Sequence, residues 1–211
     1  MTKGRALLRT IKGARFNSWS EIEVEVRDGF AIAPDGVSVM TVAHRHGRSD
    51  RKPQTAIIEG WGRWRGAYAS SYSHDSHNLV VYGYHPAEMA RAANAVIEMG
   101  GGIAVVKDDR VTAQIAYPIA GLLSDKSPAE VAREHKRVVE ATSEICAWQP
   151  PYRTFKALEG QSLACNPGPH LTDLGLTDGE SKEICDPLVP RFRSSHALAA
   201  PLMRTSESKG H

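Results

Sequence analysis

The stretch that organises this chain is Tyr68-Ala69-Ser70-Ser71-Tyr72-Ser73-His74-Asp75-Ser76-His77-Asn78, which runs directly into Leu79-Val80-Val81-Tyr82-Gly83. The second part is a short apolar run with β-branched residues, which is typical of a buried strand. The first part gathers imidazoles, a carboxylate, an amide and hydroxyls at the entrance of that strand, a common active-site arrangement. A turn in which Ser, Asp and Asn bond their own backbone explains part of this stretch, but not two histidines three residues apart. The stretch therefore favours a functional site.

A second polar cluster follows the alternating segment 37–42, which predicts a half-buried strand. It contains His44 and His46, which lie two residues apart and would share one face of an extended chain. If strands 37–42 and 79–83 are neighbours in one sheet, which we assume, the two clusters meet. Imidazoles and a carboxylate from two such loops suit zinc, manganese, iron or cobalt. We therefore predict one divalent metal ion bound by His46, His74 and His77, with His44 in reserve. The alternative is a set of separate surface or capping histidines.

Three imidazole ligands would leave a metal position open for water, which the metal acidifies to a pKa of about 7. The resulting hydroxide can attack an sp² carbon of a small nitrogen heterocycle, replacing an amino or sulfur group or opening the ring. We predict Asp75 as a further ligand or the proton shuttle and Asn78 as a ligand or an orienter of an imidazole. His170, held by Pro167-Gly168-Pro169, is predicted as a further ligand or as the acid to the leaving group. Cys165 ranks below these as a nucleophile, because no sequence-adjacent base supports it.

Aromatic and cationic side chains alternate between glycines in Trp61-Gly62-Arg63-Trp64-Arg65-Gly66. Arginine interleaved with tryptophan can stack on or clamp an anionic or planar ligand. We therefore predict that Trp61, Arg63, Trp64 and Arg65 bind the substrate. The alternative is a wide turn whose aromatic side chains pack together.

The remaining patterns predict an α+β fold with mixed or antiparallel sheets and two principal helices in a single domain. Strands are expected at 21–26, 30–33, 37–42, 56–60, 79–83, 103–106 and 111–116. One helix, 86–99, begins with Pro86 and ends at a glycine triplet, and the other, 128–148, follows a Ser127–Glu130 capping box and precedes Pro150-Pro151. We divide the chain into a basic N-terminal segment (1–20), the domain (21–187) and a flexible tail (188–211). Residues 155–176 are expected to be irregular.

Composition limits the function classes. A net charge of +2 argues against a nucleic-acid partner, and the apolar runs are too short to cross a membrane. The three cysteines form no Cys-x-x-Cys pair and suit a reducing compartment, and the apolar core Ala6-Leu7-Leu8 is too short for a signal peptide. We expect a cytoplasmic protein with a small heterocyclic substrate, and a homo-oligomer is left open.

Several of these segments resemble the C-terminal domain of bacterial adenine deaminases. They are His46-Gly47, 59–67, 73–81, 100–105, 118–125 and 171–176, so the resemblance covers roughly residues 30–180. The most specific combination is His-Asp-Ser-His-Asn followed downstream by three glycines. The resemblance implies a family that is similar to amidohydrolases and whose metal centre lies in a separate barrel domain. This sequence shows no segment for a barrel of about 250 residues, so the family's catalytic residues are not carried over.

Two functions follow from the residues and the resemblance. The first is a metal-dependent hydrolase that deaminates, desulfurates or opens a small nitrogen heterocycle. The second is a non-catalytic accessory domain or subunit that partners an amidohydrolase barrel, in which the His-Asp-Ser-His-Asn loop is a rigidifying polar network at the docking surface.

Overall fold

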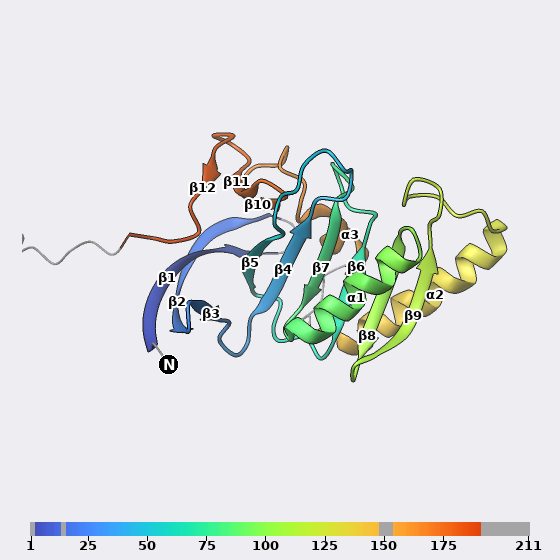
Figure 1. The fold of residues 1–211 in the computed structure, drawn as a ribbon, viewed down its shortest axis with the longest axis horizontal. Helices are drawn as coiled ribbons and strands as arrows, with labels where there is room; N and C mark the ends of the chain where they lie inside the picture. The colour runs from blue at the N-terminus through green and yellow to red at the C-terminus, as the bar shows by residue number, and fades with distance from the viewer. Residues whose placement is uncertain (1–2, 14–15, 148–153, 191–211) are drawn as a thin grey trace, which may run out of the picture.

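The computed structural model describes residues 3–13, 16–147 and 154–190, and these form two sheets and three helices (Figure 1). Across the large sheet the strand order is β3 (Phe30–Ile32), β2 (Ser18–Arg27), β1 (Lys3–Lys12), β5 (Gln54–Glu59), β4 (Ser38–Ala43), β7 (Leu79–Gly83), β6 (Ala67–Ser70), β8 (Gly102–Lys107) and β9 (Arg110–Ala116). The small sheet contains β10 (Pro169–Thr172), β11 (Gly175–Asp178) and β12 (Ile184–Cys185). The large sheet is antiparallel except where β1 meets β5 in parallel, so the predicted α+β class with mixed sheets is confirmed.

The helices cover both faces of the large sheet (Figure 1). Helix α1 (Pro86–Glu98) buries its apolar side against alternate strand residues such as Ala67, Ala69 and Val81. Helices α2 (Pro128–Ile145) and α3 (Thr154–Gly160) lie on the other face, where Tyr68 and Tyr82 point. Successive strand residues point to opposite faces, so the two-residue period of the strands builds both cores. None of the described helices is long and apolar enough to cross a membrane.

The ends of the two principal helices agree with their sequence signals. Ser127 caps α2: its hydroxyl accepts the Glu130 N–H, and the Glu130 carboxylate accepts the Ser127 N–H at 3.0 Å. This is the reciprocal capping box that the sequence predicts. Helix α2 ends at Ile145, whereas Trp148 and Pro150-Pro151 lie outside the described residues. Helix α1 ends before Gly100, whose φ of 74° provides the left-handed turn.

The structure contains strands and a helix that the sequence patterns did not predict. Strand β1 lies within the basic segment 1–20, and β6 lies within the polar stretch that precedes β7. Strand β6 escaped prediction because three of its four residues, Ala67, Ala69 and Ser70, are small, although all four are buried. The expectation that residues 155–176 are irregular is wrong, because helix α3 and strands β10 and β11 overlap this segment; its prolines and glycines conceal any period.

Gly100 and Gly101, which directly precede β8, offer a test of how tightly the backbone is packed at that end of the strand. Gly101 has a φ of 125°, and a Cβ there would lie 2.4 Å from the Cα of Gly121, whereas a Cβ at Gly100 would meet nothing within 4 Å. We expect Gly101→Ala to lower the free energy of unfolding by about 3 kcal/mol, because left-handed strain adds to a backbone clash. Gly100→Ala is the matched control and should cost about 1 kcal/mol, from strain alone. Urea denaturation measures both, and equal losses would contradict the close approach.

Candidate functional site

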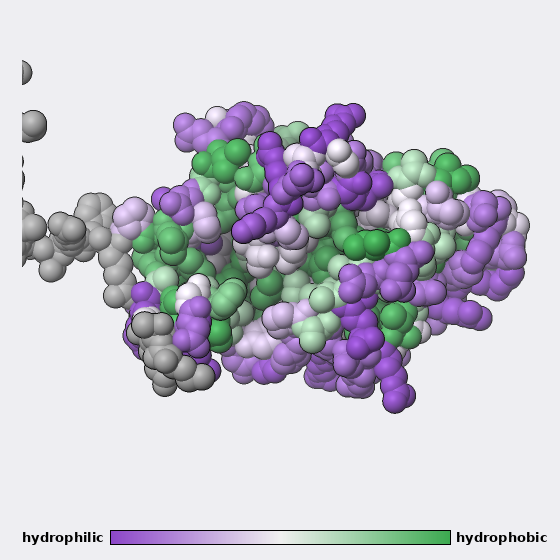
Figure 2. Space-filling model, in the orientation of Figure 1, coloured by the Kyte–Doolittle hydropathy of each residue, from purple (hydrophilic) through white to green (hydrophobic). Residues whose placement is uncertain are grey.

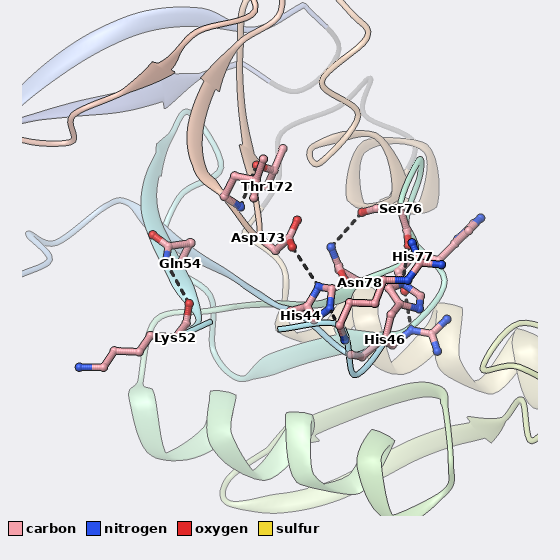
Figure 3. Close-up of polar contacts among 12 residues, drawn as sticks. His44, His46, Lys52, Gln54, Ser76, His77, Asn78, Thr172 and Asp173 are labelled. Carbon is pink, nitrogen blue, oxygen red and sulfur yellow. Dashed lines mark hydrogen bonds and ion pairs between the residues drawn. The ribbon is translucent and has the colours of Figure 1, made fainter. Parts of the chain in front are cut away.

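The two histidine clusters lie side by side because of how β4 and β7 pair. The strands run antiparallel with Ala43 opposite Leu79, so the residues after β4 lie beside the residues before β7. This confirms the assumption that segments 37–42 and 79–83 are neighbours in one sheet. Figure 2 shows hydrophilic side chains over the loop that joins β4 to β5, and Figure 3 shows the histidines at its start.

His44 joins the end of β4 to the turn between β10 and β11. Its Nδ1 lies 3.0 Å from the Asp173 carboxylate, and its Nε2 lies 3.3 Å from the Arg48 backbone nitrogen (Figure 3). A carboxylate only accepts and a backbone N–H only donates, so this geometry assigns the neutral tautomer with the proton on Nδ1. Both ring nitrogens of His44 are therefore engaged.

The next two residues reach two other loops. Arg45 donates from Nε to the carbonyl of His77 and from Nη2 to the carbonyl of Ala120, the latter at 3.0 Å. His46 donates from Nε2 to the Ser76 carbonyl at 2.8 Å. We name His44–His46 the loop hub, because these three consecutive residues connect the loops 72–78, 117–123 and 172–174.

His74 and His77 form a compact aromatic group with Tyr72. The ring centroids of the two histidines are 5.3 Å apart, and each lies 5.5 Å from the Tyr72 ring. The loop is fixed to the end of α3, since the His74 backbone N–H donates to the Glu159 carbonyl at 3.1 Å and Ser162 Oγ donates to the His74 carbonyl at 2.6 Å. The rings are therefore held in place while remaining half-buried at the surface.

Two polar atoms in this loop are buried without a hydrogen-bond partner among the described residues. They are Nδ1 of His77 and Oδ1 of Asn78. The Asn78 amide nitrogen donates to Ser76 Oγ at 3.0 Å, so one end of that amide is satisfied and the other is not (Figure 3). Burial lowers the pKa of His77, and the neighbouring His74 and Arg45 lower it further. The His77 imidazole is therefore neutral at neutral pH.

The predicted metal ligands are close together but are not arranged as a metal centre. Within the described ranges, no group of three or more His, Cys, Asp or Glu side chains is placed to hold a metal ion. His46 donates a hydrogen bond from Nε2 to the Ser76 carbonyl, and Asp75 is exposed at the loop tip. The side chains as they stand do not fit a metal ion, so we derive no reaction step through one, and metal binding by His46, His74 and His77 stays a prediction.

His170 lies in a different polar network. Its Nδ1 is 3.2 Å from the Gln161 carbonyl and 3.4 Å from the Asn17 amide nitrogen, and the side chain is only 3% exposed. Burial lowers its pKa. The structure thus places His170 in the contact between β10 and the segment after α3, and its predicted role as an acid or ligand stays a prediction.

The structure separates the tryptophan–arginine string from the histidines. Trp61 and Trp64 are fully buried and pack on Tyr82, with ring centroids 5.4 and 6.0 Å away, so they are core side chains. The Arg63 guanidinium lies 4.4 Å from the ring of Tyr84, which directly follows β7, whereas the histidine loop precedes β7. A five-residue strand spans roughly 16 Å. A ligand would meet Arg63 and Arg65 without the indoles, and substrate binding by this string stays a prediction.

Sequence reasoning missed three residues of this site: Arg45, Asp173 and Glu159. Glu159 is a half-buried carboxyl near His74, and burial raises its pKa. Its side chain lies among tyrosines at the α2 and α3 face, and no local pattern marks it. The sequence did contain a signal for Arg45. It stands between His44 and His46, so in an extended segment its side chain points to the opposite side and can reach a different loop.

The fold and the site define an α+β domain with a histidine-rich loop cluster at one end of its main sheet. The model of the adenine deaminase C-terminal domain matches residues 15–183, so the chain belongs to that family and the resemblance seen in the sequence is confirmed.

Relatives show how much of a longer protein this domain represents. An adenine deaminase of Serratia proteamaculans is 57% identical over 186 residues, which are 88% of this chain and 31% of that protein. One of Klebsiella pneumoniae is 56% identical over 186 residues, with the same two shares, and adenine deaminase 2 of Rhizobium meliloti is 50% identical over 192 residues, which are 90% and 32%. The chain therefore spans about a third of the length of these relatives.

The lowered pKa of His170 predicts a pH dependence of stability. As the pH falls, His170 in the unfolded chain takes up a proton near pH 6.5, before His170 in the folded protein does. The stabilisation of the folded state that comes from neutral His170 is therefore complete above about pH 6.5 and is lost as the pH falls towards the lowered pKa. We expect the free energy of unfolding to fall from pH 7 to pH 5, and His170→Asn, which keeps an N–H for the Gln161 carbonyl, to reduce that fall. Urea denaturation at the two pH values measures it. His85→Asn, at an exposed position, is the control, and an unchanged pH dependence in His170→Asn would refute the prediction.

Proposed function

We propose that this chain works as the C-terminal domain of an adenine-deaminase-type hydrolase, and that it completes hydrolysis at an sp² carbon of a nitrogen heterocycle instead of performing it alone. The observation that carries the proposal is the match itself. Relatives named adenine deaminase match nearly the whole chain, yet this chain accounts for only 31–32% of their length. The remaining part of such an enzyme, a barrel by the family resemblance, would supply the rest of the site.

The geometry of the loop cluster supports an accessory role over a stand-alone enzyme. Ligand sites usually enclose most of a small ligand's surface. Among the described residues, hollows of about 640 and 420 Å³ lie beside Arg5 and Glu23 and beside Val111 and Arg137, and neither of these two is lined by a predicted site residue. In the cluster, His44 and His46 hold loops together.

The groups left for chemistry are those of the exposed loop tip. Hydrolytic deamination adds the oxygen of water to the carbon and releases ammonia, so a base must accept a proton from water and an acid must give one to the leaving nitrogen. Asp75 is an exposed carboxylate, and His74 and His77 are half-buried imidazoles of the same loop. We assign proton transfer at the edge of a shared site to this loop, with Asn78 holding its conformation through Ser76.

A domain exchange tests this proposal. We expect the Serratia adenine deaminase to keep activity within about tenfold when its matched part is replaced by this chain, because 57% identity preserves most contacts. Ammonia release from adenine measures the activity. The control is the Serratia enzyme truncated before the matched part, which should lose activity at least a hundredfold. A fully active truncated enzyme, or an inactive chimaera, would overturn the proposal, as would adenine deamination by this chain alone with added metal.

Metal binding by the cluster is the second candidate. The observation that favours it is the unpartnered Nδ1 of His77 beside the ring of His74. A bound zinc, manganese, iron or cobalt ion would supply an acidified water. Holding it would require His46 to turn a free ring nitrogen towards His77, which changes its contact with the Ser76 carbonyl.

This second candidate predicts one equivalent of a divalent metal in protein purified without chelator. Elemental analysis measures it, and His77→Ala should remove the metal while thermal unfolding stays cooperative. His85→Ala, at an exposed histidine outside the cluster, is the matched control. Metal-free protein, or metal that persists in His77→Ala, would eliminate the candidate. Cytoplasmic location and homo-oligomer formation stay predictions.

A further inference from the structure

Exposed apolar side chains lie on both sides of the loop hub. Ile119 and Leu123 are 49% and 63% exposed, and they are paired across a turn that the hub holds through the carbonyl of Ala120. Leu174 is 46% exposed and follows Asp173, the partner of His44. Figure 2 shows apolar side chains gathered at the upper right, over the loop that follows β9. We name Ile119, Leu123, Leu174 and the loop hub the loop face.

The loop face also contains a cationic side chain, Arg45, which uses only some of its hydrogen-bond donors. Arg45 bonds the carbonyls of His77 and Ala120, and among the described residues it forms no ion pair with a carboxylate. Partial burial lowers its pKa, so the surroundings disfavour the charge that it carries. A guanidinium has five N–H donors, and a carboxylate brought to this surface would compensate the charge.

We infer that the loop face docks the preceding part of an adenine-deaminase-type chain, through an apolar contact at Ile119, Leu123 and Leu174 and a carboxylate that pairs with Arg45. The inference rests on the proposed function and adds the surface and the chemistry of the partner. About two thirds of each relative lies outside this domain, and the proposed shared site requires a surface of this domain that contacts that part.

Two observations favour this face and this occupant. The loop beside the hub contains two of the buried side-chain atoms that have no hydrogen-bond partner among the described residues, Nδ1 of His77 and Oδ1 of Asn78, and such atoms require a partner. A two-fold contact would place the same patch on both copies, and the residues of the loop face include no carboxylate that could pair with Arg45, so a different surface fits better. Phe30 on β3 is 74% exposed but lies at the far edge of the sheet, away from these features.

The experiment uses the chimaeric enzyme with a protease site at the junction. In the unmodified chimaera, the two pieces should stay together on size-exclusion chromatography after cleavage and remain active. We expect Ile119→Asp with Leu123→Asp to separate the pieces and to lower activity at least tenfold, because two buried charges would oppose the apolar contact. Phe30→Asp is the matched control and should change neither result. Thermal unfolding of the 211-residue chain with each substitution checks that the domain still folds.

The outcomes separate the two proposals. An inactive unmodified chimaera overturns the proposed function. An active chimaera whose pieces stay together despite the double substitution overturns the docking surface alone. If the chain by itself is a dimer that the double substitution dissociates, the occupant is a second copy and the inference is wrong. Equal effects of Phe30→Asp and the double substitution would also refute it.

Discussion

The antiparallel pairing of β4 with β7 is the constraint on which the rest of this structure depends. It sets Ala43 opposite Leu79, so the chain leaving one strand lies beside the chain entering the other. Both strands are central, since β5 and β6 flank them, and their side chains pack into cores on both faces. A shift of one residue would exchange the faces of a whole strand, which makes the register firm. The polar loops therefore extend from the most rigid part of the sheet.

The loop hub connects this rigid part of the sheet to loops that have little regular structure, and it fixes their positions. Together, His44, Arg45 and His46 reach three segments, 72–78, 117–123 and 172–174, and three of their contacts end on backbone carbonyls. Contacts to a carbonyl depend on where the backbone runs and little on which side chain it carries. The partner loops can thus differ in sequence while the hub still places them. Hydrogen bonds to charged groups contribute roughly 1.5–3 kcal/mol each, and three of the hub's contacts are of this kind: two from Arg45 and one from His44 to the Asp173 carboxylate.

Local periodicity predicted much of the fold, because alternation and helical spacing follow directly from which face is buried. It predicted β4, β7, α1 and the cap of α2, whereas the pairing of β4 with β7, which brings His44–His46 beside His74–His77, was an assumption that the structure confirms. It could not predict the bond between His44 and Asp173, which joins residues 129 positions apart. It also could not distinguish a ligand clamp from core packing at Trp61 and Trp64. Glycines permit both readings, and only the tertiary structure shows that these indoles are buried against Tyr82.

Histidine is ambiguous in sequence because one side chain serves several roles. A neutral imidazole has one N–H and one lone pair, so a ring that donates to one loop and accepts from another has nothing left for a metal ion. His44 is in that state, and His46 retains only Nδ1. His77 differs, because its Nδ1 is buried and unpartnered. Four histidines at one sheet end thus divide into two that hold loops and two that remain half-buried at the surface. This division fits a domain that shapes the boundary of a larger site, since a boundary needs fixed loops as well as a few accessible polar groups.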